Sequence, residues 1–341
     1  MTQTPGHVPR PTMKDVAARA GVGLKTVSRV VNEEPGVTPE TSARVQAAID
    51  ALGFRRNDSA RLLRTRRTAS VGLVLEDVAD PFYAALSRAV EDVARAHGAL
   101  LFTGSSAEDP RREQELVLAF CARRVDGLVV VPAGDDHRYL LPEIAAGVAT
   151  VFVDRPAGRL DADVVLTDNA GGTRLGVEHL IAHGHRRIGF IGDQPGIHTA
   201  GERLRGYRAA MEAAGLPVRP EWYAMGPTTP ERVRAALDAM LSGPEPVTAL
   251  LAGNNRVTVT AVRVLWNRPD PVALVGFDDF ELADVLDPPV TVVAQDAPGL
   301  GRAAAQQLFR RLDGIAPEEP SRVELPVRLI ARGSGEIPPP R

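Results

Sequence analysis

The amino-acid sequence predicts an α/β protein in which a small all-α head precedes a core of two doubly wound parallel sheets. Three short helical patterns with their own start and stop signals predict the head within residues 12–56. Short apolar runs alternate with amphipathic helical stretches over residues 70–333, which is typical of parallel strands covered on both faces. The length of 341 residues suits a small module and about two larger domains.

The three helices of the head follow from their end signals. Thr12 can cap the first helix, and Gly21 can end it. The second helix is expected over residues 24–32, and the third begins at Thr38 with a proline at its first position. Three short helices joined by a tight turn form a helix-turn-helix module, whose second helix enters the major groove of DNA. The alternative is a small solvated helical bundle.

The charge of the chain is divided unevenly between the head and the core. Residues 1–67 hold 12 Lys and Arg against 6 Asp and Glu, whereas the remaining residues hold 28 against 37. The head therefore has a net charge of +6 and the rest of −9, although the whole chain has only −3. A basic head on an acidic body favours a polyanion such as DNA as a partner of the head alone.

The second helix of the head carries the candidate DNA-reading side chains. Its first residues, Leu24 and Lys25, would lie at base edges, and short or cationic donors that can reach phosphates and bases follow them. The candidates for DNA contact in the head are Thr12, Leu24, Lys25, Thr26, Ser28, Arg29 and Asn32.

The segment "FRRNDSARLLRTRRTAS", residues 54–70, joins the head to the core. Asn57 or Asp58 can cap a helix of about two turns, which is too short to be stable alone in water. One interpretation is a charged, flexible linker. The other is a segment that folds on DNA and inserts a leucine into the minor groove.

Strands and helices alternate along the core. Enough strands are present for two parallel sheets, with a ligand cleft between the sheets at the carboxyl ends of the strands. The expected strands are residues 70–75, 99–103, 126–131, 148–153, 187–192, 247–252 and 272–277, and the expected helices include residues 82–97, 110–124, 171–183, 202–215 and 230–242.

Polar side chains occur where several of these strands end. Because the strand ends would meet at the cleft, these side chains are candidates for ligand contact. Arg203, near a helix start, would face the same space. Each could instead be a capping or turn residue, which is the favoured interpretation of Asp77 and Ser105. The polar residues at strand ends are Asp77, Asp80, Ser105, Asp154, Asn254, Asn255 and Asp278.

Motifs of catalysis and cofactor binding are missing from the sequence. The stretch "GGTRLG", residues 171–176, lacks the Gly-Lys-Ser/Thr of a phosphate-binding loop, and no Gly-x-Ser-x-Gly occurs. The spacing of His179, His183 and His185 could suit zinc, but the stretch lacks the carboxylate or thiol side chains that would complete the set of ligands. We interpret His183 and His185 as helix-dipole and surface partners, and Cys121 as a packed thiol. We therefore expect no enzyme, no metal and no cofactor.

The compartment is predicted from a single cysteine and from missing apolar segments. One cysteine allows no intrachain disulfide, which favours a reducing setting. The first 12 residues lack the apolar stretch of a secretion signal, and no apolar run approaches the ~20 residues of a membrane span. We expect a cytoplasmic protein without a membrane partner.

Ordered motifs along the chain resemble one family. "DVAARAGVGLKTVSRVVN", "VTPETSARVQAAIDALGFRRN", "SARLLR", "DPFYAAL", "DNAGGTRLGVEHLIAHGHRRIGFIGD" and "VALVGFDDFELADVLDPPVTVVAQD" are similar to the LacI/GalR family of bacterial transcriptional repressors. The resemblance covers nearly the whole chain after about residue 11. It implies a homodimeric repressor that reads a near-palindromic double-stranded operator and responds to a small, sugar-like metabolite.

The resemblance also implies a domain plan with a type I periplasmic-binding-protein-like core. A ligand would shift the angle between the two core subdomains and so move the hinge segments on DNA. The plan is a disordered leader (1–11), a helix-turn-helix headpiece (12–56), a hinge helix and linker (57–69), a core (70–333) and a tail (334–341). The core divides into an N-subdomain of about 70–166 and 296–322 and a C-subdomain of about 167–294 and 324–333.

Particular residues match functional positions of the family. In the hinge, the match assigns Leu63 as the inserted leucine, with Ala60 close to the groove floor and Asn57 at the start of the segment. In the core, the match places five residues at the effector pocket, and Asp80 at a strand end joins them. The expected effector-binding residues are Asp80, Phe82, Asp154, Arg203, Asn255 and Asp278.

Two departures from the family pattern qualify these expectations. Gly23 stands where the family usually has Ser, so one phosphate contact and helix cap is missing. Asn255 replaces the usual carboxylate, which weakens the case for a standard hexose.

No heptad-bearing tail follows "GEIPPPR", so a tetramer through a terminal helical bundle is not expected. The rivals are a solute-transport binding protein, an enzyme of the cleft, and a corepressor-dependent repressor or activator of the same family.

Overall fold

A computed structural model describes residues 11–32, 34–54, 67–266 and 268–340. The chain divides into two units, residues 1–68 and 69–341, and each is described by itself. The leader up to residue 10 and the three hinge candidates Asn57, Ala60 and Leu63 lie outside the described residues.

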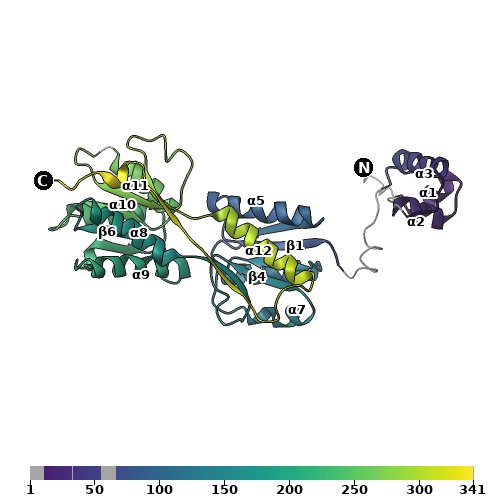
Figure 1. The fold of residues 1–341 in the computed structure, drawn as a ribbon, viewed down its shortest axis with the longest axis horizontal. Coiled ribbons are helices and arrows are strands. Elements are labelled where there is room, and N and C mark those ends of the chain that lie inside the picture. The colour runs from purple at the N-terminus through teal and green to yellow at the C-terminus, as the bar shows by residue number, and fades with distance from the viewer. Residues whose placement is uncertain (1–10, 33, 55–66, 267, 341) are drawn as a thin grey trace, which may run out of the picture. The chain divides into compact units, whose positions relative to one another are not determined.

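Within residues 11–32 and 34–54, the first unit contains three helices, α1 (Met13–Ala20), α2 (Leu24–Val31) and α3 (Pro39–Leu52) (Figure 1). The backbone N–H and the hydroxyl of Thr12 both donate to the Asp15 carboxylate at 2.7 Å, which closes the first turn of α1. Gly21 ends that helix at a φ of 63°, a conformation that glycine adopts without strain. The three predicted helices therefore form, within one or two residues of the expected ends.

The core of this first unit is small and draws on each helix. Val16 of α1, Val27 of α2 and Val45 of α3 have no exposed surface, and Ala48 and Phe54 pack with them. Because Val27 faces this core, the opposite face of α2 is left for solvent or a partner.

Two six-stranded sheets form the second unit. Their orders, β11-β5-β4-β3-β1-β2 and β12-β10-β9-β8-β6-β7, correspond strand for strand, and every pairing except that of β12 with β10 is parallel. The first sheet contains β1 (Ser70–Leu75), β2 (Leu100–Ser105), β3 (Gly127–Val130), β4 (Ala149–Val153), β5 (Asp163–Thr167) and β11 (Arg322–Leu325). The second contains β6 (Ile188–Gly192), β7 (Tyr223–Met225), β8 (Ala249–Ala252), β9 (Ala273–Phe277), β10 (Thr291–Ala294) and β12 (Arg328–Ile330).

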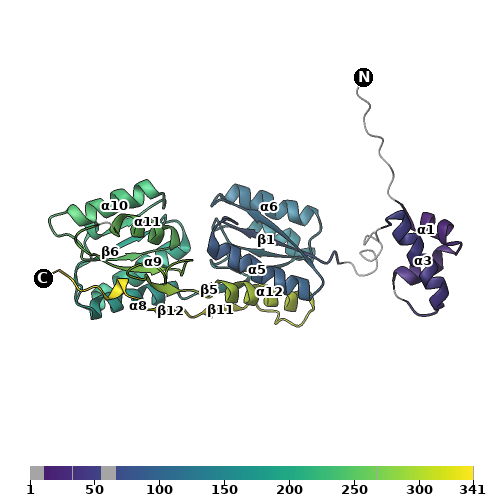
Figure 2. The same ribbon diagram turned by 90° about the horizontal axis from the view of Figure 1, so that it is seen from above.

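Helices cover both faces of each sheet, which explains the continuous apolar strands. Along β1, Leu73 packs toward α5 and α12, while Val74 packs toward α6 on the opposite face. Figure 2 shows α5 and α12 on one side of the first sheet and α6 on the other. The helices are α5 (Pro81–Ala96), α6 (Pro110–Ala122), α7 (Leu141–Ala145), α8 (Asn169–Ala182), α9 (His198–Ala213), α10 (Pro230–Ser242), α11 (Asn255–Leu265) and α12 (Ala297–Leu312). Three short 3-10 segments, η1 (Arg138–Leu140), η2 (Pro220–Trp222) and η3 (Ser334–Glu336), complete the unit.

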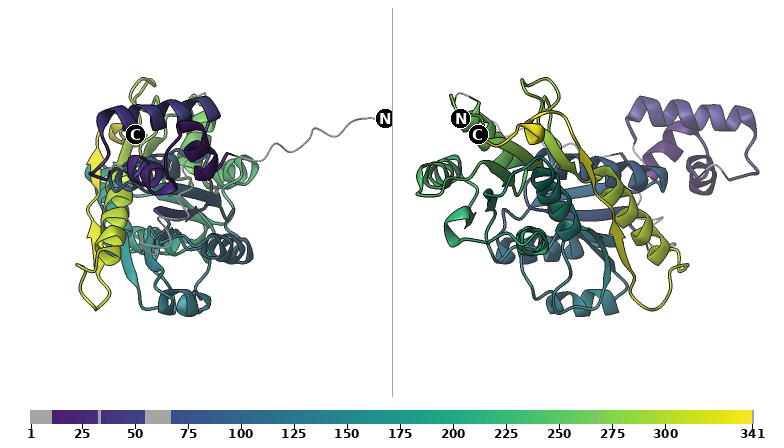
Figure 3. Two further views of the ribbon diagram at one scale, coloured as in Figure 1. Left: turned by 90° about the vertical axis from the view of Figure 1, so that its right-hand side faces the viewer. Right: turned by 60° about the vertical axis from the view of Figure 1, so that its left-hand side comes forward.

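The chain crosses between the two subdomains three times. It passes from β5 to α8, from β10 to α12 and from β11 to β12. Figures 1 and 3 show the last crossing as the yellow segment that runs along both subdomains. The predicted boundary at residues 322–324 falls inside β11, which pairs with β5 as far as Leu325, so the crossing comes two to three residues later.

The segment expected as a tail from residue 334 is packed into the second subdomain. Ser334 is fully buried, and its hydroxyl donates to the Leu274 carbonyl at 2.6 Å and accepts from the Thr291 N–H at 2.9 Å. At least η3 therefore belongs to the core rather than to a free tail.

Candidate functional site

A polar cleft lies between the two subdomains, at the carboxyl ends of both sheets, as expected for open α/β folds. All six predicted effector residues, Asp80, Phe82, Asp154, Arg203, Asn255 and Asp278, line it. The other lining residues are Glu76, Tyr83, Arg155, Asp193, Ile197, Thr199, Ala200, Gly253, Asn254, Arg256 and Gln295.

Asp154 and Asp278 occupy equivalent positions in the two subdomains. Asp154 follows β4 and Asp278 follows β9, with φ values of 70° and 71°. Each donates its backbone N–H at 2.9 Å to the neighbouring strand, to Val165 and Val293 respectively. A positive φ costs a residue other than glycine about 1–3 kcal/mol and is found mainly where function needs it. The same strained backbone conformation therefore occurs once in each subdomain, and in each it directs one carboxylate into the cleft.

Both carboxyl groups are nearly buried. Asp154 is 3% exposed and Asp278 7%. Burial raises the pKa of both, while the nearby Arg203 guanidinium acts in the opposite direction. Asp154 accepts a long bond of 3.4 Å from the Tyr83 hydroxyl and lies 3.6 Å from the Arg155 Nε. Asp278 accepts from the Gln295 amide at 2.6 Å and from the backbone N–H of Asn255. Such acceptors can take further hydrogen bonds from the hydroxyls of a ligand.

Arg203 of α9 is held rigidly beside these two carboxylates. Its Nε donates to Asn169 and its Nη1 to the Gly253 carbonyl, both at 2.7 Å. The guanidinium also lies over the Phe277 ring, 3.9 Å from its centroid. No hydrogen-bond partner for Nη2 is found among residues 67–266 and 268–340, so this nitrogen can serve a ligand.

Asp80 both caps a helix and faces the cleft. Its Oδ1 accepts from the Phe82 N–H at 2.9 Å at the start of α5, and also from Asn255 of the other subdomain at 2.9 Å. The interpretation of Asp77 as a turn residue agrees with its bond from the Ala79 N–H at 2.9 Å. The Ser105 hydroxyl likewise accepts from the Val78 N–H at 3.1 Å.

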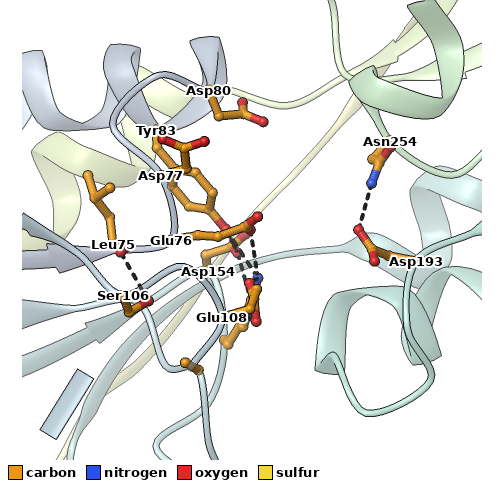
Figure 4. Close-up of polar contacts among 12 residues, drawn as sticks. Leu75, Glu76, Asp77, Asp80, Tyr83, Ser106, Glu108, Asp154, Asp193 and Asn254 are labelled. Atoms are coloured by element: carbon orange, nitrogen blue, oxygen red, sulfur yellow. Dashed lines mark hydrogen bonds and ion pairs between the residues drawn. The ribbon is translucent and has the colours of Figure 1, made fainter. Parts of the chain in front are cut away.

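The sequence analysis missed a buried charge cluster beside the cleft. Arg155 is 6% exposed and binds Glu108 through two nitrogens, at 2.8 and 2.5 Å. Its Nη2 also donates to the Tyr83 hydroxyl at 3.2 Å, and Glu76 lies 3.4 Å away. Figure 4 shows Tyr83, Glu76 and Glu108 gathered beside Asp154. Burial and the neighbouring Glu108 raise the pKa of Glu76 to about 8. The position of Arg155 directly after Asp154 was the only signal in the sequence.

The histidine cluster has a structural role that differs from the prediction. His185 is buried, not on the surface, and its ring bonds the Thr248 hydroxyl at 2.9 Å and the Ile337 carbonyl at 2.7 Å. His179 lies 2.5 Å from the Glu336 carboxylate. The cluster thus anchors the C-terminal segment, and no metal-binding group of three side chains is found among the described residues.

The thiol of Cys121 is packed, as predicted. The residue is 8% exposed, and burial raises its pKa to about 11. Such a thiol stays protonated at neutral pH and is a poor nucleophile.

The DNA-contact candidates of the head gather around α2. Thr12, Leu24 and Lys25 are exposed, Leu24 by 47%. Thr26, Ser28, Arg29 and Asn32 are half-buried, and the Asn32 amide donates to the Ser28 hydroxyl at 3.2 Å. Gly23 is the N-cap of α2 and supplies no side-chain cap, as its sequence departure implied.

These features define a class of protein. A helix-turn-helix head followed by a two-subdomain core with a polar cleft is the architecture of a ligand-responsive DNA-binding regulator. Residues 12–57 match the family described as bacterial regulatory proteins, lacI family, and residues 177–335 match the periplasmic binding protein-like domain.

Relatives match over almost the whole chain. The HTH-type transcriptional regulator CelR of Thermobifida fusca is 36% identical, over 96% of this chain and 98% of its own. The ribose operon repressor of Escherichia coli K12 is 32% identical over 95% and 99%. Among solved structures, a CelR–cellobiose complex has a TM-score of 0.70 at 34% identity over 95% and 100%. A lac repressor dimer bound to operator and the anti-inducer ONPF has a TM-score of 0.84 at 26% identity over 96% and 99%.

The chain belongs to the LacI family. It is therefore a sequence-specific DNA-binding transcriptional regulator and not an enzyme, and its partners are DNA and a small molecule. None of the described helices has the length and apolar character needed to cross a membrane.

Proposed function

We propose that the protein is a cytoplasmic homodimeric repressor whose operator affinity is set by a neutral, polyhydroxylated ligand in the cleft. The observation that carries the proposal is the pair of buried carboxyl groups, Asp154 and Asp278, one from each subdomain, that line the same cleft. A ligand that binds both ties the subdomains together and so can select one angle between them.

The charges of the cleft support a neutral ligand rich in hydroxyls. Five carboxyl groups and three guanidiniums line it, and each guanidinium already has protein partners, which leave only the Nη2 of Arg203 for a ligand among the described residues. An anion would meet an excess of negative charge, whereas sugar hydroxyls can donate to the carboxylates. The CelR–cellobiose complex makes cellobiose the first candidate to test.

Exposed apolar side chains support the homodimer. Leu100 and Phe102 of the edge strand β2 are 70% and 39% exposed, and Leu118 of α6 is 37% exposed. Contiguous exposed apolar side chains mark interaction surfaces. On the second subdomain Leu282 and Val285 are 61% and 68% exposed. A dimer would bring two heads to a near-palindromic operator, one half-site to each.

The hinge completes the proposal for DNA binding. We place the headpiece at residues 12–56, the hinge at 57–69, and the effector and dimerisation core at 70–336. By their match to the family, Asn57, Ala60 and Leu63 would lie at the operator centre, with Leu63 in the minor groove. Unstacking one base step costs a few kcal/mol, which the contacts allowed by the bend offset.

A binding experiment with matched variants tests this function. An operator is selected from random duplexes, and its affinity for the protein is measured by fluorescence anisotropy with and without cellobiose. We expect Asp278→Asn and Arg203→Ala to leave operator affinity unchanged but to weaken cellobiose binding by roughly 10- to 100-fold, because each leaves a buried polar group unpaired.

The control variant changes a carboxylate that lies next to Asp278 in sequence but outside the cleft. Asp279→Asn changes a neighbouring carboxylate that pairs with Arg332 at 2.7 Å outside the cleft, so it should keep cellobiose affinity. Unchanged cellobiose affinity in Arg203→Ala or Asp278→Asn would refute the pocket assignment. The sign of the change in operator affinity distinguishes an inducer from a corepressor.

A further inference from the structure

A second set of contacts closes the cleft from within the protein. Arg256 of α11, in the second subdomain, reaches across to the loop between β1 and α5 in the first. Its Nη1 lies 3.0 Å from Glu76, its Nε 3.3 Å from Asp80 and its Nη2 3.6 Å from Asp77. Asn255 adds its 2.9 Å hydrogen bond to Asp80. Two consecutive residues of one subdomain thus hold three acidic residues of the other.

The position of Arg256 in α11 is electrostatically unfavourable without these partners. Arg256 is the second residue of the helix, where the N-terminal end of the helix dipole is positive and favours anions. The cap of α11 is supplied by Asn254, which accepts from the Val257 N–H at 2.9 Å, so Arg256 has no part in capping. Its interactions lie across the cleft instead, where it is drawn by the carboxylates of the facing loop.

Arg256 also fills the space that a ligand needs. It lines the cleft together with the predicted effector residues, and the cavity that remains has a volume of about 50 Å³. Pockets for small molecules have volumes of ~300–1,000 Å³. The closed arrangement therefore has no room for a sugar, and either the Arg256 side chain or the subdomains must move before a ligand can enter.

The contacts lie on the side of the core where opening would break them. Figure 2 shows the segments that cross between the subdomains, around β5, β11 and β12, along one side, with α6, α10 and α11 along the other. Rotation about the crossing segments would move α11 away from the first subdomain and so break the contacts of Arg256 with the β1–α5 loop. An ion pair at that place restrains opening more than one beside the crossings would.

We propose that Arg256 is an internal occupant of the effector site, which holds the ligand-free core closed and which the effector displaces from Asp80. This inference rests on the proposed function for the identity of the site, but not for the closure itself. When Arg256 leaves, Asp80 and Glu76 become free to accept hydroxyl groups of the effector. Arg256 thereby sets how tightly an effector must bind to open the core.

Distance measurements without any ligand test the closure. Spin labels at Arg112→Cys in α6 and Arg234→Cys in α10, both exposed sites, report the gap between subdomains in a Cys121→Ser background. We expect Arg256→Gln to add a population at longer distance, and Asp80→Asn, which keeps the oxygen that caps α5, to do the same. Arg263→Gln, on an exposed face of the same helix, should match the parent. A distance distribution unchanged by Arg256→Gln would overturn the proposal.

A titration with cellobiose tests the displacement. By calorimetry, Arg256→Gln should bind cellobiose roughly 5–150-fold more tightly than the parent, the usual range for removing a competing state, and Arg263→Gln should not. Weaker binding in Arg256→Gln would show that Arg256 contacts the effector, which contradicts the proposal. Binding of cellobiose by neither parent nor variant would refute the proposed effector, while the distances would still decide whether Arg256 closes the core.

Discussion

At the scale of single residues, the cleft is governed by carboxyl groups that the fold holds away from water. Asp154, Asp278 and Glu76 each lie at the end of a strand, and burial raises the pKa of all three. The pKa of a partly desolvated group depends strongly on the few charged groups that lie near it. Those neighbours are Arg155, Arg203 and Arg256, which lower the pKa of these carboxyl groups and so oppose the effect of burial.

Glu76 gives a pH prediction with a definite sign. Its pKa is about 8 in the folded chain against 4.5 ordinarily, so between these values the folded state holds a proton that the unfolded chain has released. Folding stability contributed by Glu76 therefore falls as pH rises through this window. We expect Glu76→Gln to lose less thermal stability than the parent between about pH 5 and about pH 9, measured as melting temperature. Parallel curves for the two proteins would contradict the pKa shift of Glu76.

At the scale of elements, the sequence predicted seven of the strands seen in the described residues and missed β5, β7, β10, β11 and β12. The expected strands at 70–75, 148–153 and 272–277 form at or within one residue of their bounds. β5 begins with a buried Asp163 that binds Arg311 and Ser321, and β12 begins with Arg328, so neither reads as an apolar run. These strands depend on partners distant in sequence, which a local pattern does not contain.

The helix α11 was also missed, because its residues favour a strand. Its sequence "NRVTVTAVRVL" is rich in β-branched residues, which favour strands, and no helix was predicted there. Asn254 caps the start of α11, and the Thr258 hydroxyl donates to the Asn254 carbonyl at 2.8 Å. Tertiary packing of Val257 and Ala261 in the second core then overrides the local preference. The candidate site could be predicted by family match for five residues and from a strand end for Asp80, whereas the Arg256 contacts could not, because they join segments about 180 positions apart.

The recognition helix α2 carries the prediction that belongs to this scale. Leu24 and Lys25 are exposed at its N-terminal end, whereas Val27 is buried, so we expect Leu24 and Lys25 to reach base edges and Val27 not to. Exchanging Leu24 and Lys25 for other residues should change the operator sequence selected from random duplexes, at about 1–3 kcal/mol per altered base contact. The control Gln46→Ala, on the exposed face of α3, should select the parental sequence. The same selected sequence after the double exchange would remove these residues from base reading.

At the scale of the whole molecule, the proposed dimer would couple two heads through two joined cores. A single small head buries too little DNA surface for tight specific binding, so in this proposal two heads act together. The core supplies the means, because two sheets of matching strand order enclose the cleft and three crossings let them move as bodies. A ligand that changes their angle changes the relation between two subunits only if the subunits are joined through the core.

The last prediction concerns the proposed dimer interface on the edge strand β2. Leu100 and Phe102 alternate on β2 with Leu101, which packs inward, and the Phe102 ring lies 6.2 Å from that of Phe120 on α6. An edge strand with exposed apolar side chains is a liability unless another surface covers it. Phe102→Glu would place a charge in that covered surface, so we expect it to yield monomers by analytical ultracentrifugation. Ile315→Glu, at a 67% exposed site elsewhere on the same subdomain, should remain dimeric.

The effect of Phe102→Glu on DNA separates a dimer contact from a folding defect. The monomer should keep its melting transition and its weak binding to a single half-site, since its head is untouched. Its affinity for a full palindromic operator should fall by roughly 10²–10⁴-fold, because linking two modules contributes that much without any new contact. A Phe102→Glu protein that stays dimeric, or that binds the palindrome as the parent does, would place the dimer interface on another face of the core.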